Sequence, residues 1–422
     1  MKEDDRMEQK NYKFQDVCEI VTDYVANGSF KSLADNVQYS DKKDYARLIR
    51  LVDFNNNYDE KNAVWVPESS YNFLKKSVLY GDEVIISNVG ANLGTVFKCP
   101  KLTYPMTLGP NSLLVRTNDL CNQNYLYYYL KSKIGYSKLM ALVSGSAMPK
   151  FNKTELRNME ISLPDIAYQD KAVEVLIKID KKIELNNKIN NNLFELLKTN
   201  FKNNFYNKGE NDSYLLDYIS ETIGGDWGKE SPEGNNNTKV YCVRGADIPN
   251  MEYGNKGNAP IRYILEKNYK NKKLDPNNII IEISGGSPTQ STGRTAYITQ
   301  NILDMYDSPL LCTNFCRAIE TKDEMLAPFV YMNLKLMYED NIFFNWENGT
   351  TGIKNLALHD MLANTEVKTP DEDVIKEFYL LFNNVMNKIS NNSSENIKLE
   401  QLRDALLPKL MNGEIDLDNV EI

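Results

Sequence analysis

The chain has 422 residues, with 49 Lys and Arg, 58 Asp and Glu, one His and six Cys. This length allows two or three domains, and the 42% apolar and 25% charged residues exclude a wholly disordered or fibrous chain. The formal charge of -9 argues against a nucleic-acid partner, because phosphate contacts normally use Lys and Arg.

The sequence carries no signal for a membrane or for export. No apolar run approaches the roughly 20 residues of a membrane helix. The start, MKEDDRMEQK, lacks the basic end and apolar stretch of a signal peptide. We therefore expect a cytoplasmic protein without a membrane partner, whose Cys are reduced thiols.

The first half predicts a mixed domain followed by a long helix. Residues 84–87 and 112–116 are β-rich runs bounded by Gly, Pro or Asn, which is typical of strands, and residues 123–143 have helical spacing. Pro164 stands where a second, longer helical pattern begins, and Asp165 is its expected cap.

The second half repeats this order of elements. We expect strands at residues 240–244 and 278–283 and a helix over residues 326–343. Pro370 and Asp371 then precede a second long helix.

An internal repeat links the two halves. Residues 156–165 align without a gap to residues 362–371, at an offset of 206 that continues downstream through the long helices. Upstream the offset drifts, and residues 50–53 match residues 244–247 at 194. The repeat predicts that each half is a variable domain followed by a similar helical tail.

Both long helices have coiled-coil spacing with two Asn in the middle of the seam. The predicted pairing positions are Leu176, Ile179, Ile183, Asn186, Asn190, Leu193 and Leu197 in the first helix, and Phe382, Val385, Ile389, Asn392, Asn396 and Leu399 in the second. A buried Asn needs a polar partner, so an antiparallel pair would place Asn186 near Asn396 and Asn190 near Asn392. The alternative is two solvated Asn clusters.

The predicted fold class is α+β: two similar mixed α/β domains joined by two long helices packed as an antiparallel coiled coil, in a pseudo-two-fold internal repeat. The expected boundaries are an N-terminal arm at 1–13, a first domain at 14–163, a helical spacer at 164–208, a second domain at 209–369, a second spacer at 370–412 and an acidic tail at 413–422.

This ordered set of landmarks, occurring twice with a helical spacer, resembles the specificity subunit of type I restriction-modification systems over nearly the whole chain. Each half has an Arg-x-x-Asp segment, an Ile-rich strand ending in Gly, a Gly-Ser/Thr loop and a Pro-Asp junction into a helix. The resemblance implies a non-catalytic protein that recognises a bipartite duplex-DNA target, with one half-site for each target-recognition domain.

The resemblance also implies the partners. Family members hold two DNA methyltransferase subunits, which methylate adenine with S-adenosylmethionine, and a motor-nuclease subunit can join them. The S-adenosylmethionine, ATP and Mg would then belong to the partners, and none to this chain. The alternative is a targeting subunit of a solitary DNA methylation or other defence assembly that lacks a restriction subunit.

The residues favour DNA recognition over catalysis. The sequence has no Gly-Lys-Ser/Thr phosphate loop and no Asn-Pro-Pro-Tyr/Phe methyltransferase signature. Cys312 and Cys316 are spaced like metal ligands, but no second pair completes a site, so we expect them in the core and no metal in this chain. His359 and the cluster of Asp360, Glu366 and Lys368 have no full counterpart in the first half.

Candidate DNA contacts are polar residues around the repeated landmarks, because Arg suits guanine, Asn and Gln suit adenine, and Lys, Ser and Thr suit phosphates. In the first domain they are Lys42, Lys43, Arg47, Lys75, Lys76, Ser87, Asn88, Asn92, Ser144, Ser146 and Lys150. In the second they are Lys229, Arg244, Arg262, Lys270, Lys272, Lys273, Ser287, Gln290, Arg294, Thr350 and Lys354. For Arg50 and Arg244, an internal ion pair with Asp53 or Asp247 is an equal alternative.

The total charge hides a difference between the domains. Residues 14–150 hold 15 Lys and Arg against 13 Asp and Glu, a net of +2, whereas residues 214–349 hold 13 against 18, a net of -5. If partner subunits neutralise most phosphates, this chain alone should bind DNA weakly.

Overall fold

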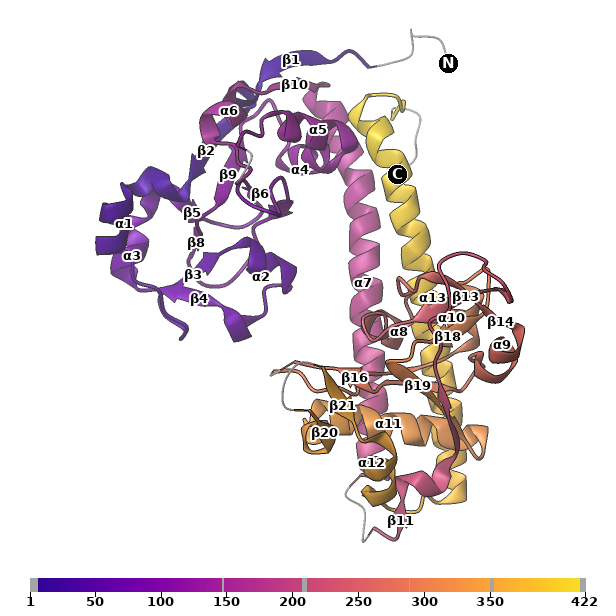
Figure 1. The fold of residues 1–422 in the computed structure, drawn as a ribbon. Helices are drawn as coiled ribbons and strands as arrows, with labels where there is room; N and C mark the ends of the chain where they lie inside the picture. The colour runs from indigo at the N-terminus through magenta and orange to yellow at the C-terminus, as the bar shows by residue number, and fades with distance from the viewer. Residues whose placement is uncertain (1–6, 146–147, 207–210, 288, 350–352, 418–422) are drawn as a thin grey trace. The chain divides into compact units, whose positions relative to one another are not determined.

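The computed structural model describes residues 7–145, 148–206, 211–287, 289–349 and 353–417 (Figure 1). The chain divides into two compact units, which are described separately. Unit 1 comprises Met1–Lys181 with Glu400–Ile422, and unit 2 comprises Lys182–Leu399. None of the helices described in these ranges has both the length and the apolar composition needed to cross a bilayer.

Unit 1 contains the first mixed domain. Its strands are β1 (Lys10–Lys13), β2 (Cys18–Asp23), β3 (Ala46–Ile49), β4 (Val64–Val66), β5 (Val78–Leu79), β6 (Val84–Ser87), β7 (Val96–Lys98), β8 (Met106–Leu108), β9 (Ser112–Thr117) and β10 (Glu160–Leu163). Its shorter helices are α1 (Phe30–Asn36), α2 (Leu51–Asn55), α3 (Glu68–Phe73), α4 (Gln123–Lys131), α5 (Lys133–Ala141) and α6 (Lys153–Asn158). The sheets have the strand orders β2-β9-β6-β7, β4-β3-β8-β5 and β1-β10.

Unit 2 contains the second mixed domain. Its strands are β11 (Ser213–Tyr214), β12 (Ile219–Gly224), β13 (Asn236–Val243), β14 (Ile261–Leu265), β15 (Ile279–Glu282), β16 (Ser284–Gly285), β17 (Thr295–Tyr297), β18 (Leu310–Cys312), β19 (Cys316–Thr321), β20 (Glu347–Asn348), β21 (Lys354–Leu356) and β22 (Glu366–Val367). Its shorter helices are α8 (Ile248–Glu252), α9 (Glu266–Lys272), α10 (Gln300–Asp304), α11 (Ala327–Glu339) and α12 (Leu358–Asn364).

The two domains share one topology. The sheet β12-β19-β15-β17 repeats the order β2-β9-β6-β7, and β14-β13-β18 repeats β4-β3-β8 with the same parallel pairing of its last two strands. A break in register occurs at the same place in both, between Cys18 and Ile20 and between Ile219 and Glu221. The domains differ in β5, which is found in the first, and in the small sheet β16-β21-β20, which is found in the second. The predicted internal repeat is therefore confirmed in the fold.

The central strand of each main sheet is buried on both faces, which explains its unbroken apolar sequence. In β6, Val84 and Ile86 pack with α4, whereas Ile85 packs into a second cluster on the opposite face. In β15, Ile279 and Ile281 face one cluster and Ile280 the other. Each sheet thus lies between two apolar layers, which fix the ends of its strands in place.

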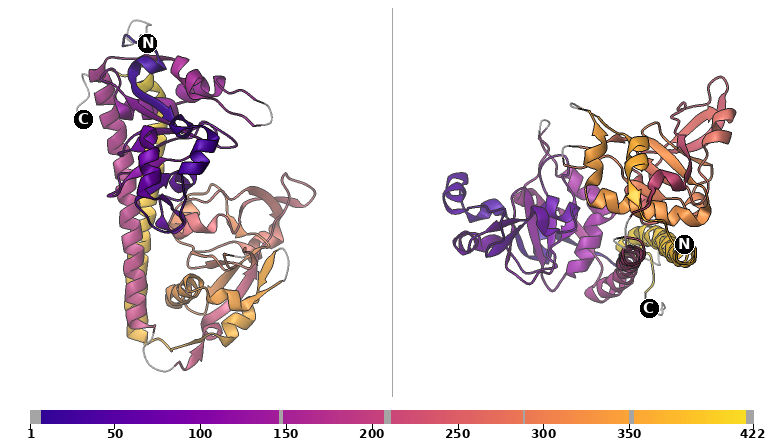
Figure 2. Two further views of the ribbon diagram at one scale, coloured as in Figure 1. Left: turned by 90° about the vertical axis from the view of Figure 1, so that its left-hand side faces the viewer. Right: turned by 90° about the horizontal axis from the view of Figure 1, so that it is seen from below.

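Two long helices, α7 (Ile166–Asn204) and α13 (Glu372–Met411), run through both units and lie side by side (Figures 1 and 2). Each begins directly after the predicted Pro-Asp junction. Asp165 Oδ1 accepts from the Tyr168 backbone N–H at 2.8 Å, and Asp371 Oδ1 accepts from that of Asp373 at 3.0 Å. These aspartates cap amide groups that would otherwise lack partners.

The helices pair antiparallel, as predicted. In unit 2, Asn186 donates to Asn396 Oδ1 at 2.9 Å, and Asn392 donates to Asn190 Oδ1 at 2.7 Å. The four Asn are at most 4% exposed, so the alternative of solvated clusters is wrong. In unit 1, Arg403 of α13 donates to Asp180 of α7 at 2.9 Å. Pairing a buried amide with another amide disfavours any shift in register that would leave one unmatched.

The apolar seam positions are buried to different degrees. The buried ones are Leu176, Ile179, Leu197, Phe382, Val385 and Ile389, and the partly buried ones are Ile183, Leu193 and Leu399. Phe194, which the seam pattern missed, is 2% exposed and packs with Leu197 in the core of unit 2.

Two predicted helices are shorter than their periodicity suggested. The pattern over residues 123–143 is interrupted at Ser132, whose hydroxyl accepts from the Gly135 N–H and starts α5. The pattern over residues 326–343 ends in α11 at Glu339, and Asn341 then takes a left-handed conformation. A serine cap of the next helix breaks the first pattern, and a left-handed residue breaks the second, although the apolar spacing continues in both.

Candidate nucleic-acid interface

In both domains, loops gather where neighbouring strands end. In the first domain, the loop after β6 meets the segment before α6, because the Gly90 N–H donates to Pro149 O at 3.1 Å and Val89 bridges Lys150. In the second domain, the loop after β15 meets the corresponding segment before α12. Ser284 of β16 pairs there with Asn355 of β21. The structure therefore brings together the two loops that the sequence predicted separately.

An Arg-x-x-Asp site follows β3 and β13 and is nearly identical in the two domains. Arg50 donates to Asp53 through its backbone N–H and Nε, both at 2.9 Å, and through Nη2 at 3.0 Å. Arg244 makes the same bonds to Asp247 at 2.9, 3.0 and 3.1 Å. The internal ion pair, one of two alternatives for these Arg, is therefore formed.

The two Arg side chains differ in how far they are exposed to solvent. The Arg50 side chain is 27% exposed and that of Arg244 is 42% exposed. Each Nη2 also donates to a backbone carbonyl, of Asn62 or of Asn258. Among the described residues, these bonds use Nε and Nη2, which leaves the N–H groups of Nη1 for an outside acceptor.

A cavity of about 520 Å³ adjoins Arg244 in the second domain. Its lining residues are Trp227, Arg244, Gly245, Ala246, Glu282, Ser284, Thr313, Asn314 and Phe315. They come from the ends of β12, β13, β15 and β18, so the cavity lies at the loop end of the domain. A concave site with aromatic walls and a few converging polar groups is typical of recognition sites.

The family model for the type I restriction modification DNA specificity domain matches residues 7–195 and again residues 208–401. The chain belongs to this family. It is a DNA specificity subunit of a type I restriction-modification system, with one target-recognition domain in each half.

Individual relatives agree with this assignment. The chain is 24% identical to the MjaIX specificity subunit of Methanocaldococcus jannaschii over 345 residues, which cover 75% of this chain and 74% of the relative. It is 29% identical to the HindI specificity subunit of Haemophilus influenzae over 128 residues, or 30% of this chain and 28% of that one. Its fold is similar to the crystal structure of the S subunit of M. genitalium, with a TM-score of 0.56 and 14% identity over 97% of this chain and 98% of the other.

In the first domain of the specificity subunit, several predicted contacts lie on the surface. The exposed ones are Lys42, Lys43, Lys75, Lys76, Asn92, Ser144 and Lys150. Lys43 lies over the Trp65 and Tyr104 rings, 5.4 and 4.9 Å from their centroids. Asn88 is partly buried and donates to Phe151 O at 2.9 Å, so it joins the two loops. Ser146 lies outside the described residues.

Arg47 and Ser87 were wrongly predicted as surface contacts. Arg47 is fully buried in β3 and donates to the carbonyls of Tyr58 and Asp59, at 2.9 and 3.0 Å. Ser87 is 3% exposed at the end of β6. Both side chains lie in strands that are buried on both faces, so neither is presented on the outer surface of the domain.

In the second domain, the predicted cations lie among carboxylates. The ion pairs join Lys229 to Glu233, Arg262 to Glu230, Lys270 to Glu266, Lys272 to Asp226, Lys273 to Asp275, Arg294 to Glu282 and Lys354 to Glu347.

The prediction that Arg262 contacts DNA needs correction, because this residue is 9% exposed. Its guanidinium carbon lies 4.0 Å from the centroid of the Trp227 ring, so it supports that ring. Gln290 is exposed and donates to the Tyr338 hydroxyl at 3.1 Å, and Ser287 is partly buried. Thr350 lies outside the described residues.

The sequence missed Glu282, Trp227 and Phe315, which line the cavity. A signal was present, because glycines follow β12 and β15 as Gly224-Gly225 and Gly285-Gly286, and the corresponding loop of the first domain has fewer. Trp227 is 38% and Phe315 54% exposed, and both line the same cavity. Cys312 and Cys316, by contrast, are buried core residues, as expected.

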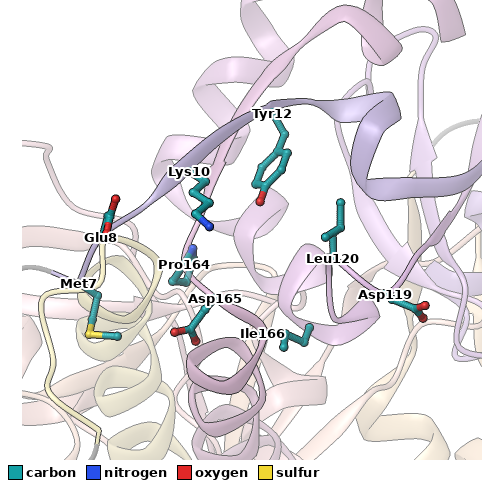
Figure 3. Close-up of a pocket in the computed structure, with 9 residues that line it drawn as sticks. All are labelled: Met7, Glu8, Lys10, Tyr12, Asp119, Leu120, Pro164, Asp165 and Ile166. Carbon is teal, nitrogen blue, oxygen red and sulfur yellow. The ribbon is translucent and has the colours of Figure 1, made fainter.

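A second cavity, of about 550 Å³, lies in unit 1 at the start of α7 (Figure 3). Lys10 and Tyr12 of β1 line it together with Asp165 and Ile166 at the helix end. Asp119 follows the end of β9, whereas Ser112 at the start of β9 pairs with Ser87. This cavity therefore lies at the opposite end of β9 from the loop that follows β6.

Proposed function

We propose that this specificity subunit carries no catalytic site and recognises a bipartite sequence in duplex DNA, one half-site with each target-recognition domain. The observation that carries the proposal is that both domains have the Arg-x-x-Asp site and a pair of loops in contact at the same strand ends. Since the loops differ in sequence and length, the half-sites should differ.

The helices and the β1 junction are the proposed attachment region for two methyltransferase subunits. This region is the part that the two halves share most closely, which suits two identical partners. The cavity at Lys10 and Asp165 belongs to it. We propose that S-adenosylmethionine for adenine methylation, and ATP and Mg for a motor-nuclease subunit where one joins, are bound by these partners. Among the described residues, no cluster of three or more His, Cys, Asp or Glu is arranged to hold a metal ion.

The test is to delete this chain in its host and to map modified bases across the genome. We expect a bipartite adenine-methylation motif to disappear and to return when the chain is restored. As a matched control, a restored chain whose second domain, residues 209–369, comes from a relative should change one half of the motif and leave the other intact. A motif that persists after deletion would refute the proposal, and copurification with or without a nuclease subunit would separate a restriction system from a solitary methylation system.

A further inference from the structure

The cavity of the second domain contains a buried carboxylate that faces a ligand space. The Glu282 side chain is 4% exposed, yet it lines the cavity. Arg294 Nε donates to its Oε2 at 2.9 Å, and Arg294 Nη2 donates to its Oε1 at 2.5 Å. Burial of a carboxylate is costly unless it is paired, and the bidentate pair with Arg294 offsets this cost. Each of its oxygens can accept a further hydrogen bond.

Two glycines leave the space that the Glu282 carboxylate occupies beside the cavity. A Cβ at Gly245 would lie 2.2 Å from Glu282 Oε1, and one at Gly285 would lie 2.6 Å from it. Any side chain at either position would therefore displace the carboxylate. The first domain has Leu51 where the second has Gly245, and Ser87 where the second has Glu282. The buried carboxylate beside a cavity is thus a feature of the second domain within the common framework.

A hydrogen-bond donor stands beside this acceptor. Arg244 adjoins Gly245 and lines the same cavity, with its orientation fixed by Asp247. Backbone bonds hold the strand ends together, because the Thr313 N–H donates to Val243 O at 2.9 Å and the Ile283 N–H donates to Phe315 O at 2.8 Å. The donor and the acceptor are therefore held in place before any ligand arrives, which lowers the cost of binding.

The aromatic side chains form the walls. The Trp227 ring is supported by Arg262, and Phe315 is 54% exposed at the mouth. A ligand seated against these walls would displace water from the polar groups between them. An unmatched polar group is then costly, so the site can discriminate between hydrogen-bonding patterns.

This inference rests on the proposed function and deepens it: we propose that the cavity recognises one G·C base pair in the half-site of the second domain. Arg244 Nη1 donates to O6 or N7 of guanine, and Glu282 accepts from the N4 amino group of cytosine. Guanine presents two neighbouring acceptors and cytosine one donor in the major groove, which matches a cation beside a carboxylate. Glu282 and Phe315 are thereby specificity-determining residues.

The test compares Glu282→Gln with Glu320→Gln in the assembled methyltransferase complex. Glu320 is exposed on β19 of the same domain and does not line the cavity, so this variant controls for loss of a negative charge. Binding is measured by competition against duplexes that carry each of the four base pairs at every position of the mapped motif. The half-site of the second domain is the one that changes when residues 209–369 are exchanged.

We expect Glu282→Gln to lower the preference for G·C at one position of this half-site by about 10-fold, with the other half-site and Glu320→Gln unchanged. Phe315→Ala, at an exposed position where folding is not at risk, should weaken the preference at the same position. A wild-type motif without G·C in this half-site, unchanged preferences in both cavity variants, or equal losses at every position would overturn the assignment. If the wild-type complex shows no bipartite motif at all, the proposed function fails, and the assignment fails with it.

Discussion

The two target-recognition domains share a framework but use their positive charges differently. In the second domain, every predicted cationic contact forms an ion pair within the domain, at 2.5 to 3.7 Å. In the first, Lys42, Lys75, Lys76 and Lys150 are exposed and form no ion pair with any residue that the structure describes. A free surface Lys can neutralise a phosphate directly, whereas a paired one must first exchange its partner.

We infer from this difference that the two domains contribute differently to DNA binding. The net charges of +2 for residues 14–150 and -5 for residues 214–349 follow the same division. We infer that the first domain contributes more to salt-dependent attraction, and that the second contributes more to discrimination between bases. The total of -9 therefore describes neither DNA-facing surface.

The largest expected effect concerns the shared Arg-x-x-Asp site. Asp53→Ala should destabilise the first domain by about 3 to 5 kcal/mol, because it removes the partner of Arg50 and leaves the fully buried Arg47, 3.8 Å from the same carboxylate, less compensated. Asp247→Ala should cost less, since Arg244 is 42% exposed and water can solvate it. Denaturant unfolding followed by domain-resolved hydrogen exchange measures both.

The matched control is Asp35→Ala, at an exposed position of α1. Its effect should lie within about 0.5 kcal/mol of zero. Equal losses for Asp53→Ala and Asp247→Ala would mean that the two sites are energetically equivalent despite their different burial.

The next effect is on the salt dependence of DNA binding. In the assembled complex, Lys42→Gln with Lys75→Gln should reduce the slope of log K against log salt by up to about 0.9 for each phosphate contact that is lost. Lys270→Gln with Lys273→Gln should change the slope less, because Glu266 and Asp275 already neutralise these lysines. Titrations at several salt concentrations provide the slopes. A larger change from the second pair would reverse the division of roles between the domains.

Sequence patterns predicted the framework but not the charge pairing. The constant offset of the repeat predicted the common topology, and the Asn spacing predicted the antiparallel helices, because both depend on positions that are regular along the chain. The ion pair of Arg294 with Glu282 and the stacking of Arg262 on Trp227 join strands and loops with no periodic relation. The prediction for Arg47 was wrong for a related reason. Sequence alone predicts that a charged side chain in a short strand is exposed, because it does not show the backbone carbonyls that accept its hydrogen bonds.

The cavity could not be predicted because its parts come from four strand ends. Gly245 and Gly285 matter only through their closeness to Glu282, which the fold creates. The first domain offered no template, since Leu51 and Ser87 occupy the corresponding positions. Differences between the two repeats, rather than their similarities, therefore set this cavity apart from the rest of the framework.

The smallest expected effect is on the local opening of each domain, which the reactivity of its cysteines can report. The first domain contains Cys18, Cys99 and Cys121, and the second contains Cys242, Cys312 and Cys316, all of them free thiols. Burial raises the pKa of Cys18, Cys242 and Cys312 to about 12. Since the thiolate is the reactive form, only about one in 10⁴ of such thiols is ionised at pH 8, and alkylation of the folded chain should be slow.

Opening of a domain returns its thiols to the ordinary pKa and exposes them, so pulsed alkylation with mass spectrometry measures the opening of each domain separately. A thiol whose pKa is raised by folding stabilises the folded state below its unfolded pKa, and this contribution is lost as the pH rises above about 9. Alkylation should therefore accelerate at high pH through opening as well as ionisation.

We expect Cys18, the one partly exposed thiol of the six, to react first in the wild-type chain. Asp53→Ala should accelerate the alkylation of Cys99 and Cys121, while Cys312 and Cys316 stay protected. If Asp53→Ala accelerated the alkylation of the cysteines in both domains, the two domains would open together. The substitution would then not destabilise the first domain alone.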